Sequence, residues 1–324
     1  MGYSNSPLRF PGGKTILWKF LGETIKLNNL SDGVYVEPYA GGAGAAINLL
    51  FAEYVHEVML NDADLLIYKF WKSILFQTER FIRLIHDTPV TIKEWEKQRR
   101  IFKQPFNYSD LKVGFSAFYL NRCNRSGILH AGPIGGKHQL GKWDISARFN
   151  KKNLIKRIEK IALYSSRISL FNKDAINFLE TDVCKKKSPK GILAYLDPPY
   201  YKNQGKNRLY LNFYRAEDHK ALANFITGQS SYMWLISYDN VPEIWEIYKK
   251  NVRNSFEVNY SAYKQRIGSE LIISCPELIL PEEYINEVRA IPYSPCQEKK
   301  SKRRHPLKKG VASALDSERG RVCS

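Results

Sequence analysis

The stretch Gly191-Ile192-Leu193-Ala194-Tyr195-Leu196-Asp197-Pro198-Pro199-Tyr200 decides the expected fold. Its first six residues form a short apolar run that predicts a buried strand. Two consecutive prolines cannot extend a sheet ladder, so we expect the backbone to leave the strand end in a stiff turn. Open α/β sheets bind ligands at the carboxyl ends of such strands. A carboxylate, two free proline carbonyls and a ring there suit a planar base with an amine. The alternative is an ordinary turn with a solvated Asp197.

Similar apolar runs recur along the chain and alternate with amphipathic helical segments. Helices are expected at 174–181 and 217–227. Strands are expected at residues 34–36, 58–60, 168–171, 192–196, 233–238 and 271–274. Alternation of this kind predicts an α/β fold with a doubly wound, mostly parallel sheet.

The segment from about residue 75 to 160 breaks this alternation. It is aromatic and rich in glycine, and between Asn121 and Arg167 it holds eleven Lys or Arg against two acids. That asymmetry favours an inserted binding module. We therefore expect a main domain made of residues 1–70 and 160–294, an inserted domain at 71–159, and a basic, disordered tail at 295–324.

The composition points to a polyanionic partner. The 324 residues carry a net charge of +18, of which the terminal Lys and Arg cluster supplies only a part. A basic body of this kind is typical of nucleic-acid binding, although a merely soluble basic surface is the alternative. The five cysteines form no CxxC pair, which favours reduced thiols in a cytoplasmic protein over a zinc site. We see neither a signal peptide nor the roughly 20 apolar residues that a membrane helix needs.

The second motif is a glycine-rich turn, Val36-Glu37-Pro38-Tyr39-Ala40-Gly41-Gly42-Ala43-Gly44, followed by a helical run. Glycines let the backbone approach a ligand, and a helix N-terminus offers free N–H groups. Glu37 beside the turn would repel a pyrophosphate and favours a cationic ligand. Asp62 ends the next expected strand, where an acid commonly binds ribose hydroxyls. S-adenosylmethionine is an adenosine with a positive amino-acid end. The alternative is a packing turn with surface acids.

The third motif is Arg9-Phe10-Pro11-Gly12-Gly13-Lys14-Thr15, which precedes an expected helix. Its last residues resemble the end of a phosphate-binding P-loop, but Leu8 stands where that loop needs its first glycine, so we reject an ATPase. Phe10 can stack on a ligand. Lys14 can bind either the carboxylate of the ligand or neighbouring acids.

In this order, the motifs at 9–14, 37–44, 61–64 and 197–200 resemble those of the Dam-like, alpha-class DNA adenine N6-methyltransferases. The resemblance covers most of residues 7–280. It implies a Rossmann-like, S-adenosylmethionine-dependent methyltransferase sheet with an inserted, mainly helical target-recognition domain. It also implies that the cofactor is bound by Phe10, Lys14, Asp62, Asp174 and Asp197. Three features depart from the family pattern: Phe10 where Trp is frequent, Ala43 within the glycine run, and Lys202 near the last motif.

The resemblance assigns catalysis to Asp197, Pro198 and Tyr200. The carboxylate and the Pro198 carbonyl accept the two hydrogens of the adenine amine, Tyr200 stacks on the base, and the nitrogen attacks the sulfonium methyl group in line. Positive charge on the nitrogen then develops beside a carboxylate, which stabilises it. No metal is expected. Because the amine is paired within duplex DNA, the base must be flipped out.

The expected DNA contacts lie in the inserted domain. Residues 119–127 resemble the segment that opens onto a DNA-reading hairpin in the family. Side chains of this type contact phosphates and base edges, although a solvated surface is the alternative for each basic residue. The candidates are Asn121, Arg122, Asn124, Arg125, Lys137 and Lys142. A second loop at 201–215 interleaves basic and aromatic residues without an acid, which suits a flipped base.

These observations together predict a site-specific DNA adenine N6-methyltransferase. A cytosine N4-methyltransferase and a non-catalytic DNA-binding protein on the same fold stay open as alternatives. We expect double-stranded DNA as the partner, no membrane contact, a monomer, and a cytoplasmic, nucleoid-associated location in a bacterium or a phage-infected cell. A cognate restriction endonuclease and the recognition sequence are left open.

Overall fold

The computed structural model describes residues 5–10, 14–201, 214–260 and 266–284, with the backbone alone described at 252–260 and 266–269. Within residues 1–289, the described part forms one compact unit. The expected tail at 295–324 and most of the loop at 201–215 lie outside the described residues.

The described residues contain a seven-stranded sheet in the order β3-β2-β1-β4-β5-β7-β6. Strands β1 to β5 run parallel to one another, whereas β7 is antiparallel to both β5 and β6. The strands are β1 Val34–Glu37, β2 Glu57–Asn61, β3 Ile168–Phe171, β4 Ile192–Leu196, β5 Met233–Asp239, β6 Val252–Tyr260 and β7 Arg266–Ser274. The predicted α/β sheet is confirmed. Edge strand β6 was not predicted, because its sequence VRNSFEVNY has no continuous apolar run.

The strand order reverses between β1 and β4. Val36 of β1 pairs with Met59 of β2 on one side and with Ala194 of β4 on the other. Chain connections therefore leave these two neighbouring strands in opposite directions, and the crevice at their carboxyl ends is where open α/β sheets bind ligands. The glycine turn follows β1 and Asp197 follows β4, so both lie at this point of the sheet.

Helices connect the strands. They are α1 Trp18–Leu27, α2 Gly44–Phe51, α8 Ala175–Phe178, α9 Ala216–Thr227 and α10 Pro242–Ile247. The predicted helix at 217–227 is confirmed. The one predicted at 174–181 begins with α8, capped by Asp174, and continues as a π-helical turn, Leu179–Val183. Buried side chains such as Tyr35, Leu49 and Leu196 make up the core between sheet and helices.

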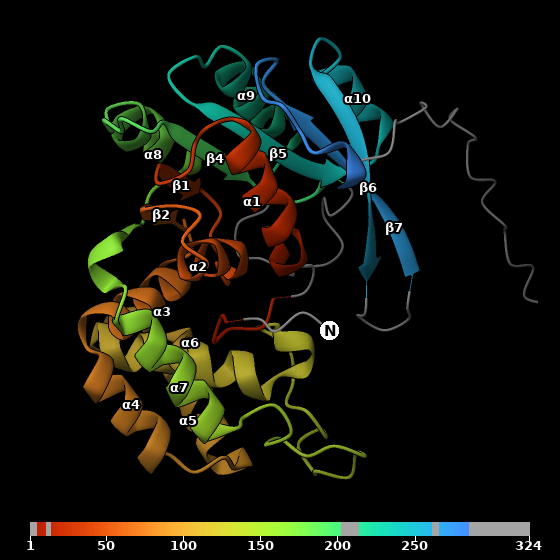
Figure 1. Ribbon diagram of the computed structural model, residues 1–324. Coiled ribbons are helices and arrows are strands. Elements are labelled where there is room, and N and C mark those ends of the chain that lie inside the picture. The colour runs from red at the N-terminus through yellow and green to blue at the C-terminus, as the bar shows by residue number, and fades with distance from the viewer. Residues whose placement is uncertain (1–4, 11–13, 202–213, 261–265, 285–324) are drawn as a thin grey trace, which may run out of the picture. The chain divides into compact units, whose positions relative to one another are not determined.

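A helical insertion separates β2 from β3. It comprises α3 Leu65–Phe76, α4 Thr78–Asp87, α5 Ile92–Lys103, α6 Asp110–Cys123 and α7 Lys151–Ala162. Figure 1 shows α4 to α7 gathered at one end of the unit and strands β4 and β5 at the other. A Cβ at Gly114 would lie 2.4 Å from the carbonyl oxygen of Lys69, so α3 and α6 approach this closely only because that residue is glycine. The predicted helical insertion is confirmed; its function as a domain at 71–159 stays a prediction.

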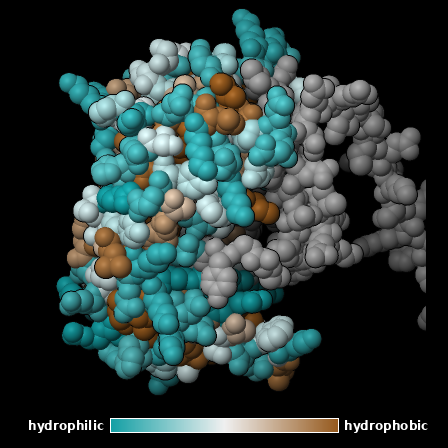
Figure 2. Space-filling view, in the orientation of Figure 1, coloured by the Kyte–Doolittle hydropathy of each residue, from teal (hydrophilic) through white to brown (hydrophobic). Residues whose placement is uncertain are grey.

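Figure 2 shows one face of the molecule as largely hydrophilic, with hydrophobic side chains in small separate groups. Among the described residues, the most exposed large hydrophobic side chains include Phe106, Leu140 and Trp143 of the insertion. None of the described helices combines the length and the apolar character needed to span a bilayer.

Candidate active site

The N-terminal segment connects the glycine turn with Asp197. The ring of Phe10 packs on the turn, since a Cβ built on Gly41 or Gly42 would lie 3.3 Å from that ring. Four residues later, the Nζ atom of Lys14 lies 2.9 Å from Oδ1 of Asp197. The structure therefore brings two predicted cofactor-binding residues, the turn and the predicted catalytic acid into one place.

The Asp197 carboxylate is held from two sides and still partly exposed. Lys14 donates to both carboxylate oxygens, at 2.9 and 3.1 Å, and the hydroxyl of Ser237 donates to Oδ1 at 3.1 Å. Ser237 is in turn bonded to the hydroxyl of Tyr195 at 2.8 Å. The side chain of Asp197 keeps 27% of its surface exposed, so a ligand can reach it.

Lys14 faces acids of the protein itself. Its side chain is only 6% exposed, and Nζ lies 3.5 Å from Oε1 of Glu270 as well as 2.9 Å from Asp197. Burial lowers the pKa of Lys14, but the charges of Asp197 and Glu270 outweigh burial, so the net shift of this pKa is upward. Lys14 is thus a buried ammonium shared between two carboxylates. The sequence left two partners open for Lys14, the carboxylate of the ligand and neighbouring acids. The structure shows Lys14 paired with neighbouring acids.

Tyr200 belongs to the same cluster. Its hydroxyl accepts a hydrogen bond from Lys14 at 2.7 Å and donates one to Glu270, while Lys14 lies 5.0 Å from the ring centroid. Pro198 is buried, and Tyr200 is half-buried beside it. The phenol is therefore anchored at its hydroxyl end. Stacking of the ring on a base stays a prediction.

Glu37 holds the end of the glycine turn through a hydrogen bond to the start of α2. This carboxylate is buried and accepts hydrogen bonds from the backbone N–H of Ala46 at 3.0 Å and from the hydroxyl of Tyr35 at 3.2 Å. Burial raises the pKa of Glu37 to about 8. From the sequence we interpreted Glu37 as an acid beside the turn that favours a cationic ligand. In the structure its carboxyl group lies at the N-terminus of α2, where its oxygen accepts from a free N–H group.

Ala43 occupies the conformation that a glycine would take most easily. Its φ of 45° and ψ of 36° are left-handed, and it immediately precedes α2. Gly41 also has a positive φ, of 46°. A non-glycine residue in this region is uncommon, which indicates that the surrounding contacts fix the turn.

Asp62 and Asp174 follow β2 and β3, which lie on the same side of β1 in the sheet. Asp62 accepts hydrogen bonds from the backbone of Gly41 at 2.8 Å and of Asp64 at 2.9 Å. Burial, helped by the charge of Asp64, raises its pKa to about 7. Asp174 is exposed and caps α8 by accepting from Ile176 and Asn177.

This set of residues fits S-adenosylmethionine. A carboxylate has about four lone-pair positions, so each of these acids keeps acceptor capacity for ribose hydroxyls or an amine. The acids at the sheet edge (Asp62, Asp64, Asp174 and Asp197) also complement a ligand with two positive charges. Phe10 offers an apolar surface beside them. Among the described residues, no group of three or more His, Cys, Asp or Glu is placed to hold a metal ion.

All of this arrangement except Glu270 lies within one family match. Residues 10–266 match the D12 class N6 adenine-specific DNA methyltransferases. The chain belongs to this family. The family predicted from the sequence is thereby confirmed, and its description names adenine-specific DNA methyltransferases.

One relative and two solved structures resemble this D12-class chain. The modification methylase StsI of Streptococcus sanguinis is 26% identical over 212 residues, which are 61% of this chain and 29% of that protein. The chain thus spans about 29% of the length of that relative. A conserved hypothetical protein from Streptococcus pyogenes has a TM-score of 0.29 at 12% identity, covering 76% of this chain and 88% of that one. The rRNA methyltransferase aviRa from Streptomyces viridochromogenes has a TM-score of 0.30 at 10% identity, covering 80% and 84%.

Two predicted DNA contacts of this D12-class chain are buried. Asn121 accepts from the backbone N–H of Arg9 and donates to the carbonyls of Arg9 and Gly127, each at 2.8 Å. Asn124 accepts from Trp95 at 2.7 Å and donates to the carbonyls of Ile128 and Leu129. Both amides are used within the protein, so we do not carry them into the proposed DNA interface.

The predicted basic contacts divide into two kinds. Arg122 is half-buried and donates to the carbonyl of Arg148 at 2.8 Å; burial and the nearby arginines lower its pKa to about 9. By contrast, Arg125, Lys137 and Lys142 are exposed. Among the predicted basic contacts, these three are the exposed ones.

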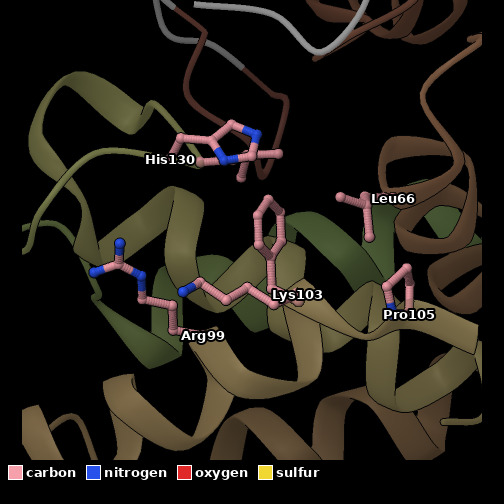
Figure 3. A pocket seen from close by; sticks show the side chains of 7 residues that line it. Leu66, Arg99, Lys103, Pro105 and His130 are labelled. Carbon is pink, nitrogen blue, oxygen red and sulfur yellow. The ribbon is translucent and has the colours of Figure 1, made fainter. Parts of the chain in front are cut away.

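A cationic pocket in the insertion was not predicted. It has a volume of about 340 Å³ and is lined by Leu66, Arg99, Phe102, Lys103, Pro105, Leu129 and His130. Figure 3 shows Arg99 and Lys103 extending toward the same side of the pocket. Within the described part of the chain, neither forms an ion pair. The sequence signal was weak, because two basic residues on a helix more often form a solvated face.

Glu270 and Ser237 are the other functional candidates that sequence reasoning missed. Glu270 is 2% exposed on β7, and Ser237 is fully buried on β5. A polar residue inside an otherwise apolar strand was the available signal in each case. It does not reveal that both side chains reach the Asp197 cluster.

Proposed function

We propose that this chain transfers a methyl group from S-adenosylmethionine to the N6 amine of a flipped-out adenine within a specific site of double-stranded DNA. The observation that carries the proposal is the Asp197 carboxylate at the strand-order reversal, held by Lys14 and Ser237 and joined to the glycine turn through the Phe10 segment. Family membership supports the same reaction.

The cofactor supplies a methyl group on a positively charged sulfur. We propose that Phe10, Asp62, Asp174 and Asp197 hold it, and that Lys14 acts through Asp197. These three acids complement the cationic ligand, and the glycine turn lets the backbone approach it. No metal ion is invoked for any step.

Asp197 and the Pro198 carbonyl are the proposed acceptors for the amine hydrogens of adenine. By accepting them, these groups favour a pyramidal nitrogen whose lone pair is directed at the methyl group. The positive charge that develops on the nitrogen lies beside the Asp197 carboxylate, which stabilises it electrostatically. Tyr200, anchored through its hydroxyl, is proposed to stack on the base and fix its plane.

The insertion at 71–159 is proposed to bind the DNA. Its exposed cations, Arg125, Lys137 and Lys142, suit phosphate contacts. We add Arg99 and Lys103 of the pocket to this set, since two cations over an apolar lining with an aromatic ring suit a nucleotide. Because cellular DNA is the proposed substrate, we also propose a cytoplasmic site of action.

The experiment is methylation of duplex DNA with radiolabelled S-adenosylmethionine, followed by digestion to nucleosides. We expect N6-methyladenine, and sequencing of methylated bases then gives the recognition site. N4-methylcytosine without N6-methyladenine would replace the proposed target base. DNA binding without transfer to any DNA would favour a non-catalytic binding protein.

A further inference from the structure

Glu270 is a buried acid in the active-site cluster to which the mechanism assigns no role. It lies on β7, opposite Asp239 at the end of β5, and is 2% exposed. Its Oε1 atom accepts the hydroxyl hydrogen of Tyr200 and lies 3.5 Å from Nζ of Lys14. A carboxylate that is desolvated to this degree is costly unless it is paired and hydrogen-bonded. Both conditions are met here by residues of the proposed catalytic site.

Among the described residues, the cluster has two carboxylates and one ammonium. Lys14 donates to both oxygens of Asp197 and to the hydroxyl of Tyr200, and that hydroxyl donates onward to Glu270. The ammonium is therefore shared between Asp197 and Glu270, and these three charges sum to one negative charge.

We propose that Glu270 is a positioning residue for methyl transfer, which fixes the Tyr200 phenol and draws the charge of Lys14 partly away from Asp197. This inference rests on the proposed function, because it concerns the same reaction. Glu270 acts through Tyr200 and Lys14 and does not itself touch the base.

The physical reason lies in what Asp197 has to do. A carboxylate that is fully neutralised by a lysine at 2.9 Å is a weaker acceptor for an amine hydrogen and stabilises a developing positive charge less. Attraction between Lys14 and Glu270 reduces this neutralisation, since Coulomb interactions are strong where little water is present. In addition, a fixed hydroxyl limits rotation and tilt of the Tyr200 ring, so the base plane is set before transfer.

Glu270→Gln tests the proposal, because it keeps the size of the side chain and an acceptor oxygen for Tyr200 while removing the charge. We expect kcat to fall by about 10- to 100-fold, on the scale of lost transition-state electrostatics and small misplacements. The dissociation constant for S-adenosylmethionine, measured by calorimetry, should stay within about 2-fold, because the cofactor residues are untouched. Glu277→Gln, an exposed acid just after β7, is the matched control and should retain wild-type kcat.

A double-mutant cycle with Tyr200→Phe tests the route. Tyr200→Phe removes the donor of this hydrogen bond and Glu270→Gln removes the charge of its acceptor, so the double variant should lose less than the product of the two single losses. Fully multiplicative losses would contradict the route through the phenol.

Other results would overturn the proposal outright. A kcat for Glu270→Gln that stays near the wild-type value would do so. So would a loss that disappears when activity is expressed per folded molecule from thermal unfolding, because Glu270 would then be purely structural. Absence of methyl transfer by the wild-type protein on any DNA would instead overturn the proposed function, and this inference with it.

Discussion

The ammonium nitrogen of Lys14 lies 2.9 Å from one carboxylate oxygen of Asp197 and 3.1 Å from the other, across 183 residues of sequence. Lys14 follows the Phe10 segment that packs on the glycine turn, and Asp197 follows the central strand β4. Together with the packing of Phe10 on the turn, this contact holds the N-terminal segment against the end of the sheet.

Removing the carboxylate of Asp197 should abolish methyl transfer and leave DNA binding largely intact. In Asp197→Ala the amine of the base loses its charged acceptor, and we expect kcat to fall by at least about 100-fold. The measurement pairs a methylation assay with a fluorescence-anisotropy titration of duplex DNA. Asp87→Ala, exposed on α4, is the control. A variant that methylates DNA at the normal rate would remove Asp197 from the proposed mechanism.

Lys14→Ala should destabilise the fold. The substitution leaves Asp197 and Glu270 facing each other without the ammonium that they share, and breaking a buried pair in this way costs about 3–5 kcal/mol. Urea unfolding followed by circular dichroism measures the loss. Lys19→Ala, on the exposed side of α1, should change the free energy of unfolding by no more than about 0.5 kcal/mol. Equal effects of the two substitutions would contradict the buried cluster.

The free energy of unfolding of the cofactor-free protein should fall as the pH rises from about 5 to 8. Burial raises the pKa of Glu37 from 4.5 to about 8, so within this window the folded state binds a proton that the unfolded state has released. Stability is then fully present below the lower pKa and is lost at up to about 1.4 kcal/mol per pH unit. Asp62, with its pKa raised to about 7, adds a loss of the same sign. Denaturation at several pH values measures this slope.

Glu37→Gln should make that slope shallower. The amide keeps an acceptor oxygen for the N–H of Ala46 but does not titrate. Glu283→Gln, an exposed substitution, serves as the control and should leave the slope as it is in the wild type. An unchanged slope in Glu37→Gln would mean that Glu37 is ionised in the folded protein.

Lys137→Ala and Lys142→Ala should weaken DNA binding through lost phosphate contacts. Each contact contributes about 0.9 to the slope of log affinity against log salt concentration, so each variant should show a correspondingly shallower salt dependence. Affinities measured across a salt series on specific and unrelated duplexes give both slopes. Lys187→Ala, exposed in the sheet-bearing part of the chain, should behave as the wild type. Unaltered slopes for the two insertion variants would place the DNA elsewhere.

Asn121→Ala should lower the stability of the fold and leave the affinity for DNA unchanged. Its amide satisfies the N–H and carbonyl of Arg9 and the carbonyl of Gly127, and leaving such buried groups unpaired costs about 1–3 kcal/mol each. Thermal unfolding should shift downward, whereas the DNA affinity of the folded variant should match the wild type. A stable variant with weakened or altered base preference would restore Asn121 as a DNA contact.

The sequence was sufficient to predict the features that depend on local pattern. The apolar runs before Asp197 and before the glycine turn each predict a strand, and the stop imposed by two prolines or by glycines places the polar residues at the strand ends. Since parallel strands share one edge for their carboxyl ends, the meeting of the turn with Asp197 follows from the same pattern.

Contacts between segments that are distant in the sequence could not be predicted from local patterns. Glu270 approaches Tyr200 only because β7 runs antiparallel beside β5, which no local pattern specifies. Asn121 and Asn124 carry side chains suited to adenine edges, but partners more than a hundred residues away (Arg9) or in a local turn (Ile128, Leu129) occupy them. The hydrogen bond that Glu37 accepts from Ala46 of α2 was likewise not predictable, because it depends on the depth of the turn.

The bonds between Asn121 and the backbone of Arg9 have a practical consequence for engineering. These hydrogen bonds join the helical insertion to the N-terminal segment of the chain, although a long stretch of sequence separates the two. A chimera that carries the insertion of a relative, made in order to change the target sequence, would also need the N-terminal segment of that relative. Without that segment, the contact between the insertion and the N-terminal segment would be mismatched next to the proposed active site.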